Sequence, residues 1–141
     1  MIQNKEAMET KFNFNSQICT SRSQSERLLA LGLKKETADC TLIPSCDNDG
    51  TYVPKIGNLY LELRDGAIPA WSLDRLRELI PENIFTAVGN QLYRVMYSGV
   101  LTYEEWNETL VSFEEANIYD RCISCIEWLI KEGYFNKEYL V

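Results

Sequence analysis

The sequence predicts an α+β fold, in which a mostly antiparallel sheet of about five to seven strands packs with three helices. Segments with the alternating pattern of half-buried strands outnumber the amphipathic helical segments. The predicted strands are joined by short turns, which connect antiparallel neighbours. The chain has 141 residues and is 45% hydrophobic, which suffices for one buried core but not for two.

We expect residues 1–22 to form a loosely ordered N-terminal arm, because they are polar and weakly patterned, and residues 23–141 to form a single α+β domain. The first helix is predicted to begin at Ser23, since Ser23 and Glu26 have the spacing of a capping box. Gly32 is predicted to end this helix, because glycine tolerates the left-handed conformation of a helix stop.

A β-hairpin is predicted next. Residues 40–46 and 51–56 resemble two strands, and residues 47–50 read Asp-Asn-Asp-Gly, which is typical of a tight turn. Pro44 and Pro54 cannot donate ladder hydrogen bonds, so this hairpin is expected to be irregular or to lie at a sheet edge.

A strand and a helix are predicted between residues 59 and 80. Leucines at 59, 61 and 63 alternate with other residues, which predicts a half-buried strand over 59–63. The helix is predicted over residues 72–80, because Ser72 can cap its N-terminus and Pro81 ends it.

Four more strands are predicted before the last helix. Residues 84–88 and 92–97 are expected to pair as a hairpin that turns at 89–90. Two further strands are expected near residues 100–103 and 109–113.

The last helix is the most clearly marked element. Apolar residues recur at three- and four-residue steps between a cap at Asn117 and a stop at Gly133. Apolar residues continue past that stop at Tyr134, Phe135, Tyr139 and Leu140, so the C-terminal tail is expected to dock on the domain. Cys122 and Cys125 form a C-x-x-C within the apolar stripe, which favours buried core thiols over a redox site at an exposed helix N-terminus.

The charge of the chain disfavours direct binding of nucleic acid. The formal net charge is -7. Residues 95–141 contribute -6 of it, with nine acids and three bases, and no basic stripe is present for a phosphate backbone. We expect a cytoplasmic protein that does not cross a membrane, because no run approaches the ~20 apolar residues of a membrane-spanning helix and no secretion signal is visible.

The residue inventory restricts the catalytic chemistry. The chain has no histidine, which excludes Ser-His-Asp and Cys-His nucleophile pairs. No glycine-rich phosphate loop is present, and we assign no catalytic residue and no cofactor. A four-thiolate zinc site would require Cys40 and Cys46 to meet Cys122 and Cys125 in space, which the sequence leaves open.

Aromatic residues near the acidic C-terminal part are the candidates for an interaction surface. Trp106 and Trp128 are the candidate anchors, because exposed tryptophans are common in recognition surfaces. Glu104, Glu105 and Glu108 are the candidate acidic rim. A solvated face and a core role are the alternative interpretations of the same residues.

Three stretches carry a resemblance. They are SERLLALGLKKETADC at 25–40, IPAWSLDRLRELIP at 68–81 and CIEWLIKEGYFNKEYL at 125–140. Their pattern of LGL-x-x-ETAD, AWSL and WLI-x-x-GY resembles small proteins encoded on prophages and mobile elements of Bacteroides-type gut bacteria. The resemblance implies a genetic context and transfers no site residue, activity or cofactor.

The leading functional hypothesis is a non-enzymatic phage- or element-encoded accessory protein that binds a host or phage protein. The alternative is a histidine-free hydrolase or ligand-binding domain that uses carboxylates in a cleft, for which a concave pocket with convergent acids is expected.

Overall fold

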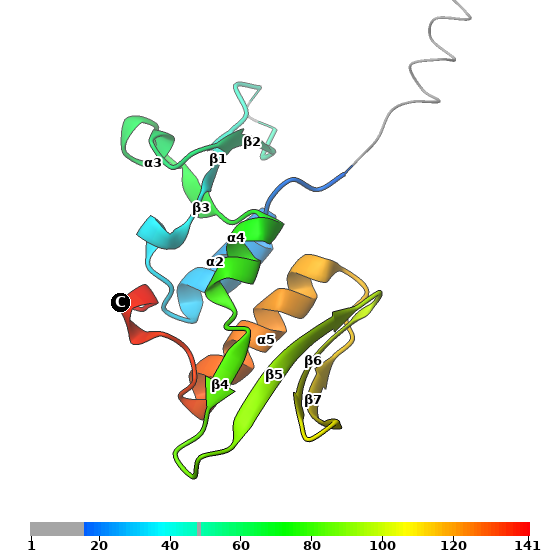
Figure 1. The fold of residues 1–141 in the computed structure, drawn as a ribbon. Coiled ribbons are helices and arrows are strands. Elements are labelled where there is room, and N and C mark those ends of the chain that lie inside the picture. Colours follow the sequence, from blue (N-terminus) through cyan, green and yellow to red (C-terminus); the bar gives the residue numbers. More distant parts are fainter. Residues whose placement is uncertain (1–15, 48) are drawn as a thin grey trace, which may run out of the picture.

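The strands of the protein form two antiparallel sheets (Figure 1). The structure is a computed structural model that describes residues 16–47 and 49–141. The first sheet has the strand order β2-β1-β3 and the second the order β4-β5-β6-β7. The strands are β1 (Cys40–Pro44), β2 (Tyr52–Ile56), β3 (Ile68–Ala70), β4 (Asn83–Phe85), β5 (Gln91–Tyr97), β6 (Val100–Glu105) and β7 (Glu108–Phe113). The helices are α2 (Arg22–Ala30), α3 (Tyr60–Leu63), α4 (Leu73–Leu79) and α5 (Ile118–Glu132), with single 3₁₀ turns η1 (Lys35–Thr37) and η2 (Lys137–Tyr139). The α+β class is confirmed, whereas the expectation of one sheet is wrong.

The separation into two sheets arises between β3 and β4. Strand β3 was not predicted, and it pairs with β1 so that Ala70 lies opposite Cys40. The chain then enters α4 almost directly, and β4 pairs with β5. Because a helix occupies the segment between β3 and β4, the chain leaves the first sheet before the second begins.

The N-cap of helix α2 lies two residues earlier than predicted. Its N-cap is Ser21, whose Oγ accepts a hydrogen bond from the backbone N–H of Gln24, while Gln24 Oε1 accepts one from the Ser21 N–H. The predicted capping box of Ser23 and Glu26 is therefore wrong. Gln24 also reaches α5, where its Nε2 donates to Asp120 Oδ1 at 2.8 Å, so tertiary contacts favour the earlier of the two overlapping boxes.

The end of the predicted N-terminal arm is packed against the domain. Residues 1–15 lie outside the described residues. Cys19 and Thr20 are buried, and the Thr20 N–H donates to the Trp71 carbonyl at 2.9 Å while Thr20 Oγ1 accepts from the Trp71 N–H at 3.0 Å. Packed structure therefore begins before residue 21.

The hairpin predicted over residues 40–56 is confirmed as β1 and β2, with Leu42 opposite Pro54. Strand β2 lies at the sheet edge, where a residue without an N–H is tolerated. Strand β1 is central, and Pro44 is its last residue.

The strand predicted over residues 59–63 is wrong, because α3 occupies this segment as a single helical turn. Leu59 and Leu63 are exposed, so their alternation did not mark a buried face. Strand β1 already pairs with β2 on one side and with β3 on the other, which leaves no free edge of β1 for another strand.

Helix α4 confirms the prediction for residues 72–80. Ser72 caps it by accepting from the Arg75 N–H at 3.1 Å. The carboxylate of Asp39 holds this cap in turn, since it accepts hydrogen bonds from the Ser72 N–H and hydroxyl.

Helix α5 confirms the predicted limits. Asn117 Oδ1 accepts from the N–H groups of Tyr119 and Asp120, and Gly133 adopts φ +80°. The tail docks as expected, because the Lys34 N–H donates to the Tyr139 carbonyl at 2.8 Å.

The four strands predicted over residues 84–113 are confirmed as β4 to β7, with small shifts of their ends. Helix α5 lies along one face of this sheet, and α2 and α4 pack against α5 (Figure 1). The main core fills the space between them and contains Leu92, Leu101, Tyr103 and Leu129. Because side chains alternate along a strand, the neighbours of these residues point to the opposite face of the sheet.

Candidate protein-binding surface

The face of the β4-β5-β6-β7 sheet that points away from α5 is the candidate site, and we call it the outer face. Strand register places Tyr93 opposite Glu104 and Phe85 opposite Gln91, and Ile84 and Leu92 between them are buried on the inner face. Phe85 is 73% exposed, and Tyr93, Tyr97 and Leu110 are also exposed. Exposed aromatic residues on one sheet face are typical of interaction sites.

Trp106 lies at one end of this face, in the turn between β6 and β7. Its side chain is 85% exposed. Glu105 lies opposite Glu108, so Trp106 and Asn107 alone form the turn, with φ of 52° and 66°. Positive φ at both central residues is the type I′ geometry, which favours asparagine and glycine and disfavours a bulky side chain. The fold therefore presents an indole to solvent from a position where tryptophan is conformationally unfavourable.

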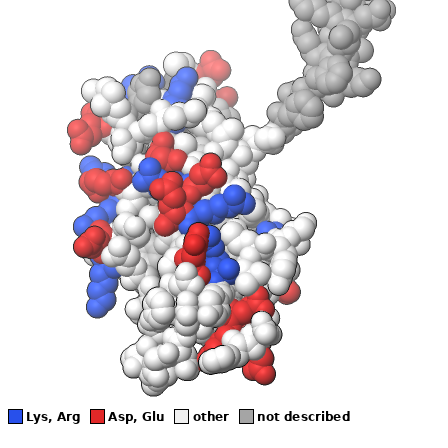
Figure 2. All heavy atoms as spheres, viewed as in Figure 1, with Lys and Arg blue, Asp and Glu red and all other residues white. Residues whose placement is uncertain are grey.

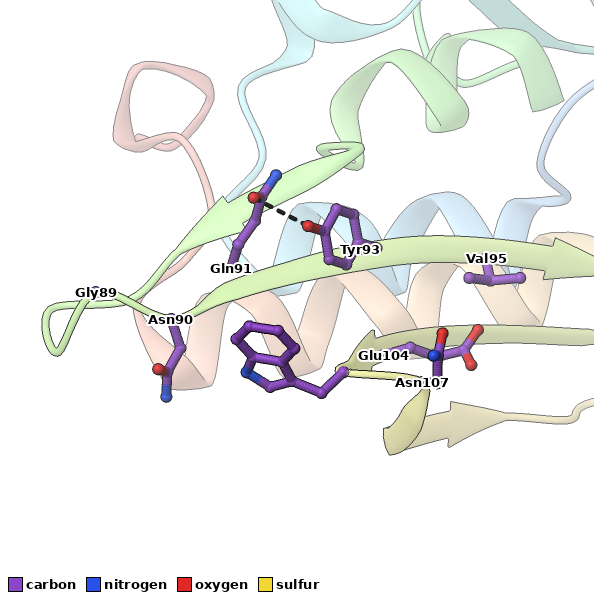
Figure 3. A pocket seen from close by; sticks show the side chains of 8 residues that line it. Gly89, Asn90, Gln91, Tyr93, Val95, Glu104 and Asn107 are labelled. Carbon is purple, nitrogen blue, oxygen red and sulfur yellow. Dashed lines mark hydrogen bonds between the residues drawn. The ribbon is translucent and has the colours of Figure 1, made fainter.

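Two hollows flank Trp106. The larger has a volume of about 600 Å³, and Figure 3 shows side chains that line it. It is lined by Gly89, Asn90, Gln91, Tyr93, Val95, Glu104, Trp106 and Asn107. The hydroxyl of Tyr93 donates to Gln91 Oε1 at 3.1 Å, which orients both side chains on this face (Figure 3).

The smaller hollow has a volume of about 250 Å³ and lies beside β7. Glu105, Trp106, Glu108, Thr109 and Leu110 line it. Trp106 thus belongs to both hollows, and the three predicted rim glutamates all lie in their walls. The structure brings four of the five predicted surface residues together.

Trp128 is the exception, because it does not lie with the other four residues. It is half-buried on α5 and packs against the core. Its ring stacks on Tyr103 with centroids 5.6 Å apart and contacts Phe113 edge-on at 6.3 Å. Tyr103 faces the inside of the sheet, so Trp128 lies on the inner side, whereas Trp106 lies in the turn at the end of the sheet.

The sheet is acidic at its Trp106 end, where Glu104 points to the outer face and Glu105, with Glu108 opposite it, points to the other face. Residues 83–113 contain the three glutamates and a single base, Arg94. The Arg94 guanidinium donates to the Ile80 carbonyl at 2.7 Å and to the Arg77 carbonyl at 3.1 Å, so it is engaged at the end of α4. In Figure 2 the lower end of the molecule is white and red, and the blue side chains lie over its middle and upper parts.

The cysteines support the core interpretation of the C-x-x-C. Cys122 and Cys125 are fully buried in the main cluster, and burial raises the pKa of the Cys122 thiol from 9.0 to about 11. Cys40 belongs to a separate small cluster with Cys19, and Cys46 is exposed. The four thiols of the zinc hypothesis are therefore not brought together.

The enzymatic alternative finds limited support in the hollows. The hollow of about 600 Å³ contains one carboxylate, that of Glu104. A separate hollow of about 610 Å³ lies beside α4, away from Trp106. It is lined by Glu36, Glu78 and Glu138 together with Lys34 and Arg75. In the described part of the chain no three acidic or thiol groups lie close enough to hold a metal ion.

Comparison of the chain with protein-family models, with curated proteins and with solved structures finds no match. Within residues 16–47 and 49–141, no helix is long and apolar enough to span a bilayer.

Sequence reasoning missed Tyr93, Asn90, Gln91 and Asn107 as neighbours of Trp106. A signal for the turn was present, because Trp106 and Asn107 separate two alternating segments by two residues and asparagine favours positive φ. The approach of the 89–91 segment depends on strand register, which the sequence did not reveal.

Proposed function

We propose that this is a non-enzymatic, cytoplasmic accessory protein of a phage or mobile element, and that it binds another protein through the outer face. The exposure of Trp106 between two hollows carries the proposal. An aromatic anchor beside concave surface is the arrangement found at the energetic centre of protein interfaces. The resemblance to prophage-encoded proteins supports the genetic context.

The neighbouring aromatic residues extend the anchor into a surface. Phe85, Tyr93, Tyr97 and Leu110 are exposed on the same sheet, and a partner that covers them removes apolar area from water. The rigid sheet holds these side chains in place before binding, which lowers the entropic cost of association.

Affinity capture tests the proposal. The tagged chain is incubated with lysate of its own host, and bound proteins are identified by mass spectrometry. Trp106→Ala is compared with Ile56→Ala, a matched control because Ile56 is 84% exposed on the other sheet. We expect one stoichiometric partner that the wild type and Ile56→Ala retain and that Trp106→Ala loses.

Loss of a central anchor costs about 2 kcal/mol or more of binding free energy, which is a decrease of roughly 30-fold in affinity. A partner retained equally by Trp106→Ala would place the interface elsewhere, and recovery of the protein alone would refute the binding function.

The alternative of a small-ligand-binding domain rests on the hollow of about 600 Å³, which falls within the size range of small-molecule sites. A fragment screen by NMR distinguishes the two. Saturable shifts at Tyr93 and Asn107 with a neutral small molecule, without any captured protein, would favour this alternative.

A further inference from the structure

We infer that the partner segment is a basic, extended strand that adds to the free edge of β7 and places lysine or arginine side chains against Trp106 and its three glutamates. This inference rests on the proposed function, because it names the chemistry of the partner that the outer face binds. Three independent observations support it.

The first observation is uncompensated negative charge. Glu105 and Glu108 lie directly opposite each other across the turn, and like charges in that position repel. The ion pairs of the described residues involve Glu26, Glu78, Glu82 and Glu127, so Glu104, Glu105 and Glu108 have no cationic partner there. A cation from another chain would relieve this repulsion.

The second observation is the aromatic surface beside the charge. Trp106 and Glu104 line the larger hollow, and Trp106, Glu105 and Glu108 line the smaller one. An ammonium or guanidinium group binds the face of an aromatic ring, most strongly tryptophan. A site that combines an indole with carboxylates therefore selects a cationic side chain over a neutral one of the same shape.

The third observation is the free edge of the sheet. Strand β7 is the last in the order β4-β5-β6-β7, and in the described structure β6 is its sheet partner. Its sequence Glu-Thr-Leu-Val-Ser-Phe has neither the lysine nor the proline that commonly protect an edge from further pairing. An added strand would continue the sheet alongside Glu108 and Leu110, and its side chains would alternate between the two faces, so that successive residues lie near the larger and the smaller hollow.

Two other surfaces, the hollow beside α4 and the exposed apolar residues near β2, fit a ligand less well. The hollow beside α4 mixes Glu36, Glu78 and Glu138 with Lys34 and Arg75, so its charges largely compensate one another. The exposed residues Val53, Ile56 and Leu59 near β2 are apolar, and among the described residues the hollow beside Leu59 is lined by aliphatic and polar side chains rather than by an aromatic ring.

The test uses a defined probe on the full chain. The probe is an acetylated nine-residue peptide that alternates arginine and threonine, and its matched control replaces each arginine by citrulline, which is neutral and has nearly the same shape. Binding is followed by two-dimensional NMR of the isotope-labelled chain. The indole N–H of Trp106 and the amide groups of residues 104–113 report on the site.

We expect saturable binding of the arginine peptide, with shifts at the Trp106 indole and along β7, and at least about tenfold weaker binding of the citrulline peptide. Changing Glu104, Glu105 and Glu108 together to glutamine should reduce the affinity for the arginine peptide by at least tenfold. Glu132→Gln, which removes one exposed carboxylate at the end of α5, should leave it unchanged.

Equal binding of the two peptides, or no binding of the arginine peptide, would overturn the inference. Concentration-dependent shifts of the β7 amides in the absence of peptide would also overturn it, by identifying a second copy of this chain as the occupant. These outcomes can be distinguished from failure of the proposed function. In the capture experiment, a partner that Trp106→Ala loses and the triple glutamine variant retains would support the binding function. The same result would refute the inference that the partner is basic.

Discussion

Replacing Trp106 by asparagine should separate the cost of the turn conformation from the contribution of the indole. Trp106 has φ 52°, and the left-handed conformation costs an ordinary L-residue about 1 kcal/mol, which asparagine largely avoids through local hydrogen bonds. Because the indole is 85% exposed, only about 30 Å² of its apolar surface is buried. Removing the indole therefore costs roughly 0.7 kcal/mol of burial free energy.

The two substitutions at this position therefore have different expected stabilities. Trp106→Ala loses the small burial and keeps the unfavourable φ, whereas Trp106→Asn loses the burial and relieves the conformational cost. We expect Trp106→Asn to be more stable than Trp106→Ala by about 1 kcal/mol, with both close to the wild type. Both variants should lose the partner.

Urea unfolding followed by circular dichroism measures the difference, and a difference of about 1 kcal/mol corresponds to a shift in Tm of roughly 3–4 °C. Equal stability of the two variants would refute the turn argument. Destabilisation of both by more than about 2 kcal/mol would show that the indole is a structural residue and would remove the basis for treating it as an anchor.

Other regions of the molecule give further expectations. Leu129→Ala, in the centre of the core, should lower the free energy of unfolding by about 2–5 kcal/mol in a urea titration, and a loss below 1 kcal/mol would contradict the packing of α5 on the sheet. Tyr103→Phe removes the hydrogen bond that the Tyr103 hydroxyl donates to the Pro81 carbonyl at 2.6 Å, and should cost about 1 kcal/mol in the same assay. Among the thiols of the described residues only Cys46 is exposed, so one thiol should react rapidly with a disulfide reagent in the native chain and five after unfolding; a second fast thiol would contradict the buried positions. Burial raises the pKa of Cys122 from 9.0 to about 11, so its contribution to stability is complete below pH 9 and is lost as the pH rises through 11; Cys122→Ala should show a smaller loss over that range, measured by thermal unfolding at each pH.

Local sequence signals predicted those elements whose ends are marked by their own capping, stop or turn residues. Helix α5 was predicted from its Asn117 cap, its Gly133 stop and the apolar period between them, and these features are sufficient because the helix is long. Helix α4 and the strands β4 to β7 were found for the same kind of reason. Alternation and turn residues do not depend on distant contacts.

Tertiary contacts decided the features that the sequence did not predict. Two capping boxes overlap before α2, and the contact of Gln24 with Asp120 favours the earlier one. Leucines at 59, 61 and 63 alternate like a strand, but both edges of β1 are already occupied. Strand β3 has only three residues and includes Pro69, so its short pattern could not be distinguished from a loop.

The sequence alone predicted part of the candidate site. Trp106 and the glutamates were found from the local sequence, because a tryptophan flanked by three acidic residues stands out there. Trp128 could not be excluded from sequence alone, since its position on α5 lies beside the main apolar stripe. Its packing on Tyr103 depends on how α5 crosses the sheet.

Site-specific photo-cross-linking tests the central claim, that Trp106 lies in a protein interface. A photoreactive phenylalanine derivative is placed at position 106 in one chain and at position 56 in another, and both are irradiated in host lysate. We expect a single cross-linked product of defined mass from position 106 and none from position 56. Products from both positions, or from neither, would contradict it.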